Sequence, residues 1–219
     1  MSWLDRVPRP SATLRAKRVF DVVAAGAGLG LLAPVCGAGV LLVWRAHGWP
    51  PFFTQRRPGL HGVPFQLIKL RTMTNERGPD GELLPDADRL TKLGRFLRGA
   101  SVDELPELWN VLIGEMSLVG PRPLLMQYLE RYDEQQMRRH DMPPGITGWA
   151  QINGRNAISW EEKFELDVWY VDNHTFWLDL RILVDTVSAV VFRRGISAEG
   201  EATMPVFMGS ASVSSNPRY

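Results

Sequence analysis

The sequence lacks disulfide chemistry, a strong net charge and any paired set of zinc-ligating side chains. The chain of 219 residues has a single cysteine, Cys36, so no intramolecular disulfide can form and a reducing or cytoplasm-facing location is favoured. Its formal net charge of +1 gives no general case for nucleic acid as a partner. The four histidines are scattered and show no ligand spacing of the kind that zinc sites use.

Several catalytic signatures are also missing. The sequence has no nucleophile elbow of a Ser/His/Asp hydrolase, no phosphate loop of the Walker type and no glycine-rich dinucleotide fingerprint. A kinase or a dehydrogenase is therefore not indicated.

One segment has the length and composition of a membrane helix. From Val22 to Trp44 there are 23 residues without a charge, too long for the apolar part of a signal peptide. Pro34 lies near the middle of this run. Basic residues flank both ends: Arg15, Lys17 and Arg18 before it, then Arg45, Arg56 and Arg57 after it.

The two basic flanks argue against a single crossing, because the positive-inside rule cannot place both of them in the cytoplasm. We therefore expect a re-entrant helix that breaks at Pro34 and returns to the face from which it entered. A straight span and a buried helix of a soluble protein remain open alternatives.

The rest of the chain predicts an α+β fold, mainly helical, with short strands, much coil and amphipathic interfacial helices. The expected parts are an N-terminal arm (1–18), the re-entrant membrane hairpin (19–45), a cytosolic catalytic domain (46–200) and a C-terminal tail (201–219). Within the domain, the pattern predicts a strand hairpin in 50–73, a basic helix Thr91–Arg98, a polar helix Leu124–His140, a helix capped by Ser159 and Glu162, and an amphipathic segment Phe176–Phe192. This last segment either lies flat on the membrane or packs into the core.

The stretch "SVDELPELWN" (101–110) has two interpretations. Ser101 and Glu104 have the spacing of a capping box, and Pro106 is tolerated near a helix start. Asp103 and Glu104 are also oxygen ligands of the kind that Mg²⁺ takes, and a carboxylate can act as a nucleophile on phosphorus. Candidate phosphate partners are Lys69, Arg71, Arg95, Arg98, Arg122 and Arg155. Spacing alone favours the cap and does not exclude catalysis.

Two long blocks resemble a known family. "LGRFLRGASVDELPELWNVLIGEMSLVGPRP" and "PGITGWAQINGRNAISWEEKFELDVWYVDN" are similar to the bacterial sugar transferases called monotopic phosphoglycosyl transferases. The resemblance runs from about Lys17 to "GISAEG". The segment "GRNAISWEEKFELDV" and the tail "RRGISAEGEAT" look most like the small enzymes that transfer an N,N′-diacetylbacillosamine 1-phosphate from UDP to undecaprenyl phosphate.

The resemblance implies a role for each matching residue. Asp103 would attack the sugar-linked phosphate and expel UMP, and Glu104 would join it in holding Mg²⁺ and assist deprotonation of the acceptor. Arg98 and Lys69 would position phosphates. Donor-site contacts would come from the turn Gly120–Pro123, which includes Arg122, and from the loop Asn153–Asn156, which includes Gly154, Arg155 and Asn156. The family breaks its membrane helix at Ser-Pro, whereas this chain has Ala33-Pro34.

The implied partners are a UDP-sugar, undecaprenyl phosphate and membrane phospholipids, at the cytoplasmic face of the inner membrane, with a homodimer left open. Two alternatives remain. One is an initiator of exopolysaccharide or O-antigen synthesis that uses UDP-glucose, UDP-galactose or another sugar. The other is a non-catalytic membrane scaffold that has kept the fold.

Overall fold

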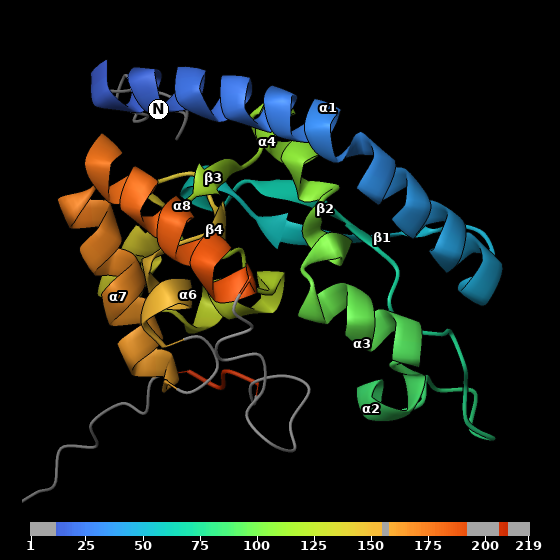
Figure 1. Cartoon of the computed structure of the whole chain (residues 1–219). Coiled ribbons are helices and arrows are strands. Elements are labelled where there is room, and N and C mark those ends of the chain that lie inside the picture. The colour runs from blue at the N-terminus through green and yellow to red at the C-terminus, as the bar shows by residue number, and fades with distance from the viewer. Residues whose placement is uncertain (1–11, 155–157, 192–205, 210–219) are drawn as a thin grey trace, which may run out of the picture.

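The computed structural model describes residues 12–154, 158–191 and 206–209 (Figure 1). The long helix α1 (Ala12–His47) lies across the top of the chain's other elements, over α4 and the first pair of strands. The remaining elements are β1 (Phe52–Pro58), η2 (Leu60–Gly62), β2 (Pro64–Leu70), α2 (Asp86–Arg89), α3 (Lys92–Gly99), η3 (Val102–Glu104), α4 (Glu107–Ile113), β3 (Ser117–Val119), η4 (Met126–Arg131), α5 (Glu134–Met137), η5 (Arg138–His140), β4 (Gly145–Thr147), α6 (Trp149–Asn153), α7 (Trp160–Asn173) and α8 (Phe176–Val191).

Helix α1 is continuous through Pro34, so the break expected there is not seen, and the helix bends along its length in Figure 1. A proline inside a helix removes one backbone hydrogen bond and favours such a bend. The helix begins at Ala12, so residues 12–18 of the expected N-terminal arm belong to it. Its stretch Leu14–His47 is long and apolar enough to cross a membrane, and only 11% of the most apolar window is buried. A core helix of a soluble protein would be mostly buried.

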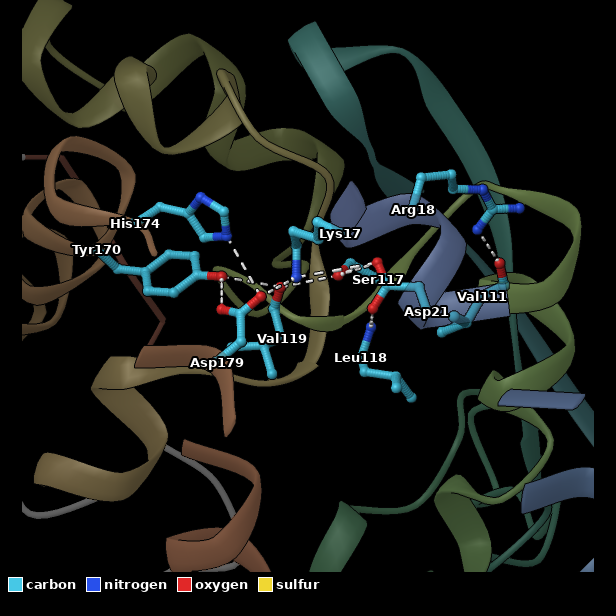
Figure 2. A network of polar contacts seen from close by, with 10 residues as sticks. All are labelled: Lys17, Arg18, Asp21, Val111, Ser117, Leu118, Val119, Tyr170, His174 and Asp179. Carbon is cyan, nitrogen blue, oxygen red and sulfur yellow. Dashed lines mark hydrogen bonds and ion pairs between the residues drawn. The ribbon is translucent and has the colours of Figure 1, made fainter. Parts of the chain in front are cut away.

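The N-terminal part of α1 is attached to the domain by charged side chains. Arg18 donates to the carbonyls of Val111 and Leu112 at 2.5 and 2.9 Å, in the last turn of α4, where carbonyls have spare hydrogen-bonding capacity. Lys17 pairs with Asp179 of α8 at 2.7 Å. Figure 2 shows the contacts of Lys17 with Asp179 and of Arg18 with Val111.

Three further hydrogen bonds to carboxylates extend this network. The Asp21 carboxylate accepts from the Ser117 hydroxyl at 2.8 Å and from the Leu118 backbone N–H at 3.1 Å, which ties α1 to β3 (Figure 2). Asp179 also accepts from the Tyr170 hydroxyl at 2.6 Å. Each buried carboxylate therefore has several donors, as a buried charge requires.

The C-terminal part of α1 is attached by apolar packing. Val43 forms a buried cluster with Leu70 and Leu97. Gly39 lies so close to β2 that a Cβ there would come within 2.8 Å of the Leu70 side chain. Both ends of α1 thus contact the same domain, while an outward row of apolar side chains stays exposed: Val19, Val23, Leu31, Leu41 and Leu42.

The predicted strand hairpin is confirmed. β1 and β2 pair antiparallel, with Phe52 opposite Leu70 and Pro58 opposite Pro64. The turn between them places His61 and Gly62 at positive φ. Phe65 and Leu67 of β2 enter the main core, which also contains Ala25 of α1.

A second strand pair escaped the sequence analysis. β3 and β4 pair in parallel, with Ser117 opposite Gly145 and Val119 opposite Thr147. Each strand has three residues, shorter than the runs that sequence periodicity detects. A Cβ on Gly145 would lie 2.1 Å from the Gly120 nitrogen, so this glycine is required by the close approach of the two chain segments.

The prediction of one polar helix over Leu124–His140 is wrong. The chain there forms η4, α5 and η5, separated at Tyr132 and Asp133. Asp133 starts α5 with a capping box to Gln136, which ends the preceding turn. The interruption lets Tyr128 and Tyr132 both join an aromatic cluster around Phe164.

Two helix starts predicted from the sequence are confirmed. Ser159 and Glu162 form a capping box at the start of α7. The predicted basic helix is α3, and Thr91 caps it by accepting from the Gly94 backbone N–H. The amphipathic segment is α8, which packs Ile182 into the main core and exposes Trp177 and Val184.

Candidate active site

The stretch 101–110 begins with a left-handed residue and not with a capping box. Ser101 has φ 54° and ψ 21°, and its side chain makes no capping hydrogen bond. A turn of 3₁₀ helix (η3) carries Asp103 and Glu104, and α4 begins only at Glu107. The capping-box prediction is therefore wrong, because the Glu104 carboxylate is used elsewhere.

Glu104 lies between two cations. Its Oε1 accepts from Lys69 Nζ at 2.7 Å and from the Arg122 guanidinium. Although burial opposes ionisation, the positive charges of Arg122 and Lys69 hold the pKa of Glu104 well below its usual range. Glu104 is thus a fixed anion that aligns a lysine from β2 and an arginine from the turn after β3.

Glu107 is a third carboxylate, which the sequence analysis missed. Its side chain is 2% exposed, and Oε1 lies 3.0 Å from Lys69 Nζ. Burial and the nearby charge of Glu104 raise the pKa of Glu107 to about 7. Glu107 follows Glu104 by three residues, but nothing in the local sequence distinguished it from an ordinary acidic residue near a helix start.

A buried asparagine keeps these groups in register. Asn110 of α4 donates to the Gln66 carbonyl at 2.7 Å and accepts from the Ile68 backbone N–H at 3.2 Å. These two bonds fasten α4 along β2, so Lys69 faces both Glu104 and Glu107.

Asp103 differs from Glu104 and Glu107 in that no side chain of the described residues forms a hydrogen bond or an ion pair with it. Asp103 is 6% exposed, and within the described part of the chain its carboxyl makes no hydrogen bond or ion pair. Burial and the charge of Glu104 raise its pKa, while Lys69, Arg98 and Arg122 oppose that rise. A carboxylate that is poorly solvated and unpaired is available to act as a nucleophile.

The predicted phosphate partners fall into two groups. Lys69, Arg98 and Arg122 all lie near enough to act electrostatically on Asp103, and Arg98 is oriented by a 3.1 Å hydrogen bond to the Thr72 hydroxyl. Arg71 instead donates to the backbone carbonyls of His47 and Gly48 at the end of α1. That arrangement gives Arg71 a structural role, and phosphate contact by Arg71 stays a prediction.

Arg95 also has a backbone partner: its guanidinium donates to the Leu90 carbonyl at 2.9 Å. Gly154 ends α6, where a Cβ would lie 2.2 Å from Ile158, so the loop turns only because no side chain is present. Arg155 and Asn156 lie outside the described residues.

Two further cations near this site were not predicted as phosphate partners. Arg57 of β1 lies close enough to Arg122 that burial and the charge of Arg122 lower its pKa. Burial lowers the pKa of Lys163 in α7 to about 8, and Arg122 and Arg139 act in the same direction. In the sequence, Arg57 is recognisable only as part of a basic flank. Mutual repulsion among these cations would be relieved by an anionic ligand.

Arg122 is held by its backbone as well as by its side chain. Arg139 donates to the Arg122 carbonyl at 2.8 Å and forms a buried ion pair with Asp167 at 2.7 Å. Prolines on both sides restrict the turn further. The charge of Glu104 raises the pKa of Arg122, so this guanidinium stays charged.

The donor atoms at this site fit Mg²⁺ bound together with a phosphate. Among the described residues, no group of three or more His, Cys, Asp or Glu side chains forms a closed metal cage. Mg²⁺ is commonly held by one or two carboxylates plus substrate oxygens. Both ion pairs of Glu104 use Oε1, which leaves its Oε2 and the Asp103 carboxyl as available oxygen ligands.

Taken together, the site places an unpaired carboxyl beside a group of fixed cations. This arrangement can bind a phosphate-rich anion and present one carboxylate oxygen to a phosphorus atom.

The comparisons with known proteins agree with that chemistry. A family model described as bacterial sugar transferase matches residues 12–193. The uncharacterized sugar transferase EpsL of Bacillus subtilis is 58% identical over 199 residues, which cover 91% of this chain and 98% of that protein. The UDP-glucose:undecaprenyl-phosphate glucose-1-phosphate transferase of Caulobacter vibrioides is 40% identical over 195 residues, covering 84% of this chain and 73% of that protein.

A relative of lower identity is longer than this chain and matches it over less than half of its own length. The undecaprenyl-phosphate galactose phosphotransferase of Salmonella typhimurium is 36% identical over 199 residues, or 82% of this chain but 41% of that protein. Since the family model spans most of the chain and two relatives align over most of their own length, the chain belongs to the bacterial sugar transferase family.

Proposed function

We propose that the protein transfers a sugar 1-phosphate from a UDP-sugar to undecaprenyl phosphate and releases UMP. The observation that carries this proposal is the unpaired Asp103 carboxyl beside a Glu104 that Lys69 and Arg122 hold in place. Two relatives support the substrate classes: one is a UDP-glucose:undecaprenyl-phosphate glucose-1-phosphate transferase, and the other is an undecaprenyl-phosphate galactose phosphotransferase.

The proposed mechanism is ping-pong. An Asp103 carboxylate oxygen attacks the sugar-linked phosphorus, the bond from that phosphorus to the UMP oxygen breaks, and UMP leaves with the electron pair. The sugar phosphate then forms an acyl phosphate with Asp103. In the second half, an oxygen of undecaprenyl phosphate attacks the same phosphorus and the Asp103 carboxylate leaves. Charge balances without a net proton transfer if both phosphate monoesters are dianions.

Fixed charges in the site support both halves. Lys69, Arg98 and Arg122 stabilise negative charge on the transferring phosphate without having to reorganise. The Asp103 carboxyl and Glu104 Oε2 would hold Mg²⁺, and the ion would neutralise part of the charge on the substrate phosphates. EDTA should stop turnover and added Mg²⁺ should restore it, whereas full activity in chelator would remove the metal from the proposal.

An apolar groove of the protein beside this site can accept the lipid chain of the acceptor. The groove has a volume of about 290 Å³ and lies between α1 and the residues that follow Glu104. Its lining is Leu29, Leu32, Ala33, Cys36, Gly37, Val40, Leu105 and Leu108. A lipid phosphate at the cations would direct its isoprenoid chain toward these side chains.

We place α1 in the cytoplasmic leaflet as a re-entrant helix, with the catalytic domain on the cytoplasmic face. This placement is supported by the basic flanks, by Pro34 and by the contacts of both ends of α1 with one domain. After Cys36→Ser, cysteines introduced at Arg15 and Arg56 should be labelled from the same side. Labelling from opposite sides would require a straight span.

The sugar has two candidate classes. The tail resembles enzymes that use a diacetamido-trideoxyhexose, while the named relatives act on glucose and galactose. Incubation of membranes with a panel of UDP-sugars and undecaprenyl phosphate, followed by UMP release, tests the function and identifies the donor. Asp103→Asn should abolish UMP release, and a wild-type rate in that variant would overturn the nucleophile assignment. A chain that releases no UMP from any donor would instead be a scaffold.

A further inference from the structure

We propose that Phe207, in the C-terminal segment 206–209, is a positioning residue that holds the phosphate-binding Arg122 in its working place. This inference rests on the proposed function of the site. Nothing in the sequence marked this segment, since it falls within a stretch expected to be only a tail.

The segment is attached by one side chain and two backbone bonds. Phe207 is 2% exposed, whereas its neighbours Val206 and Met208 are 53% and 78% exposed. The Phe207 backbone N–H donates to the Tyr128 hydroxyl at 3.1 Å, and the Arg131 guanidinium donates to the Phe207 carbonyl. A segment without a specific binding position would not bury Phe207 alone among residues 206–208 and also give hydrogen-bond partners to both of its backbone groups.

The Phe207 ring completes an aromatic cluster that is separate from the main core. Its centroid lies 5.0 Å from Phe164 in an edge-on arrangement and 5.9 Å from Tyr132 in a stacked one. Tyr128 and Trp160 contact it from other directions, at 5.6 and 5.7 Å. Such ring pairs have preferred geometries, so the loss of one ring frees its neighbours to reorient.

The same two rings hold Arg139. Its guanidinium carbon lies 5.8 Å from the Tyr132 centroid and 5.7 Å from the Phe164 centroid. Arg139 in turn donates to the Arg122 carbonyl at 2.8 Å. A continuous set of contacts therefore runs from Phe207 through Tyr132 and Phe164 to Arg139, and from there to the backbone of the arginine that pairs with Glu104.

Phe207 itself does not belong to the catalytic machinery. If Phe207 is a positioning residue, its effect on turnover passes through Arg122. A general loss of stability would instead affect all groups of the site alike. A substitution of Phe207 should weaken the contribution that Arg122 makes to transfer. It should leave the contribution of Arg98 nearly unchanged, because Arg98 is oriented by Thr72 of a different segment.

The experiment compares full-length Phe207→Ala with Val206→Ala and Met208→Ala as matched controls, and with Phe207→Leu as the conservative variant. UMP release is measured with the donor that the wild type uses. We expect Phe207→Ala to lower kcat/KM for the donor about tenfold, which corresponds to 1.36 kcal/mol. Phe207→Leu, which fills part of the space without a ring, should lose about threefold, and both controls should stay within about twofold of wild type, as expected for exposed positions.

Double variants then locate the effect. The double variant Phe207→Ala with Arg122→Lys should lose less kcat/KM than the product of the two single-variant losses. The double variant Phe207→Ala with Arg98→Lys should lose kcat/KM by the full product of its two single-variant losses. Wild-type kcat/KM in Phe207→Ala, or the same coupling with Arg98 as with Arg122, would overturn the proposal. If Phe207→Ala does not accumulate, the Phe207→Leu cycle decides the same question. Failure of the proposed function would differ, because the wild type itself would release no UMP.

Discussion

The buried ion pair between Lys17 and Asp179 should determine how firmly α1 is attached to the domain. The two side chains are 4% and 1% exposed, and Nζ lies 2.7 Å from Oδ2 (Figure 2). In Asp179→Asn the Lys17 ammonium would stay buried with only Asp21, 3.9 Å away, as a remaining carboxylate. Removal of one partner of a buried pair costs about 3–5 kcal/mol, and Asp21 places the expected cost near the lower end.

Thermal unfolding of the detergent-solubilised protein measures this cost. For a chain of this size, each kcal/mol lowers Tm by about 2–4 °C, so Asp179→Asn should lower Tm by about 6–12 °C. The double variant Lys17→Met with Asp179→Asn removes both charges and should recover to within about 1–2 kcal/mol of wild type. Asp185→Asn is the matched control on the same helix, because the Arg181–Asp185 pair is 70% and 47% exposed. It should cost under about 1 kcal/mol.

Two results would refute this reasoning. One is a Tm for Asp179→Asn that matches the Asp185→Asn control. The other is a double variant less stable than Asp179→Asn alone, since the stranded charge would then not be the cause.

Two further predictions concern buried titratable groups. Glu107→Ala should lower the free energy of unfolding by about 2–3 kcal/mol, because it leaves a cavity and removes one partner of Lys69. Glu107→Gln should cost less than about 1 kcal/mol in thermal unfolding near pH 7, and equal losses in the two variants would contradict this. Burial lowers the pKa of His140 to about 3, so below its ordinary value of 6.5 the unfolded chain binds a proton that the folded chain does not. Stability should therefore fall by about 1.4 kcal/mol between pH 7.5 and 5.5 on account of this residue, and His140→Gln should remove that part of the fall.

Sequence patterns predicted the features of this fold that depend on near neighbours. The helix starts at Thr91 and Ser159, of which only the second was predicted with its cap, each need only a side chain and a backbone N–H three residues later. The β1–β2 hairpin likewise joins strands separated by a short turn. The Asp103 and Glu104 pair was found because both carboxylates are adjacent in the chain, and resemblance to a family then favoured catalysis over capping.

Features that depend on distant contacts were not predicted. The β3–β4 pair joins three-residue strands through close backbone approach at Gly120 and Gly145, which leaves no periodic pattern. Arg57 and Lys163 reach the site from β1 and α7, far apart in sequence, so nothing local connects them to Asp103. Phe207 is the same case, since its partners lie in η4, at Tyr132 and in α7.

Ser101 offers a direct test of why the local interpretation of the acidic stretch failed. A capping box needs Ser101 in an extended conformation, with Glu104 reaching back to it. In the structure Ser101 is left-handed at φ 54°, and Glu104 is held by Lys69 and Arg122. Charge pairing across the fold is stronger than a neutral cap, because both partners of Glu104 are cations in a poorly solvated site.

The two geometries predict opposite effects of Ser101→Thr. Thr caps helices almost as well as Ser, so a capping box would tolerate this change. A β-branched residue is disfavoured in the left-handed region, and the observed geometry therefore predicts a loss of at least about 1 kcal/mol. Ser101→Gly is the control: relief of the backbone cost offsets the entropy that glycine gains in the unfolded chain, so Tm should stay at or above that of wild type. A Ser101→Thr variant as stable as wild type would show that Ser101 is extended and would return Glu104 to the cap.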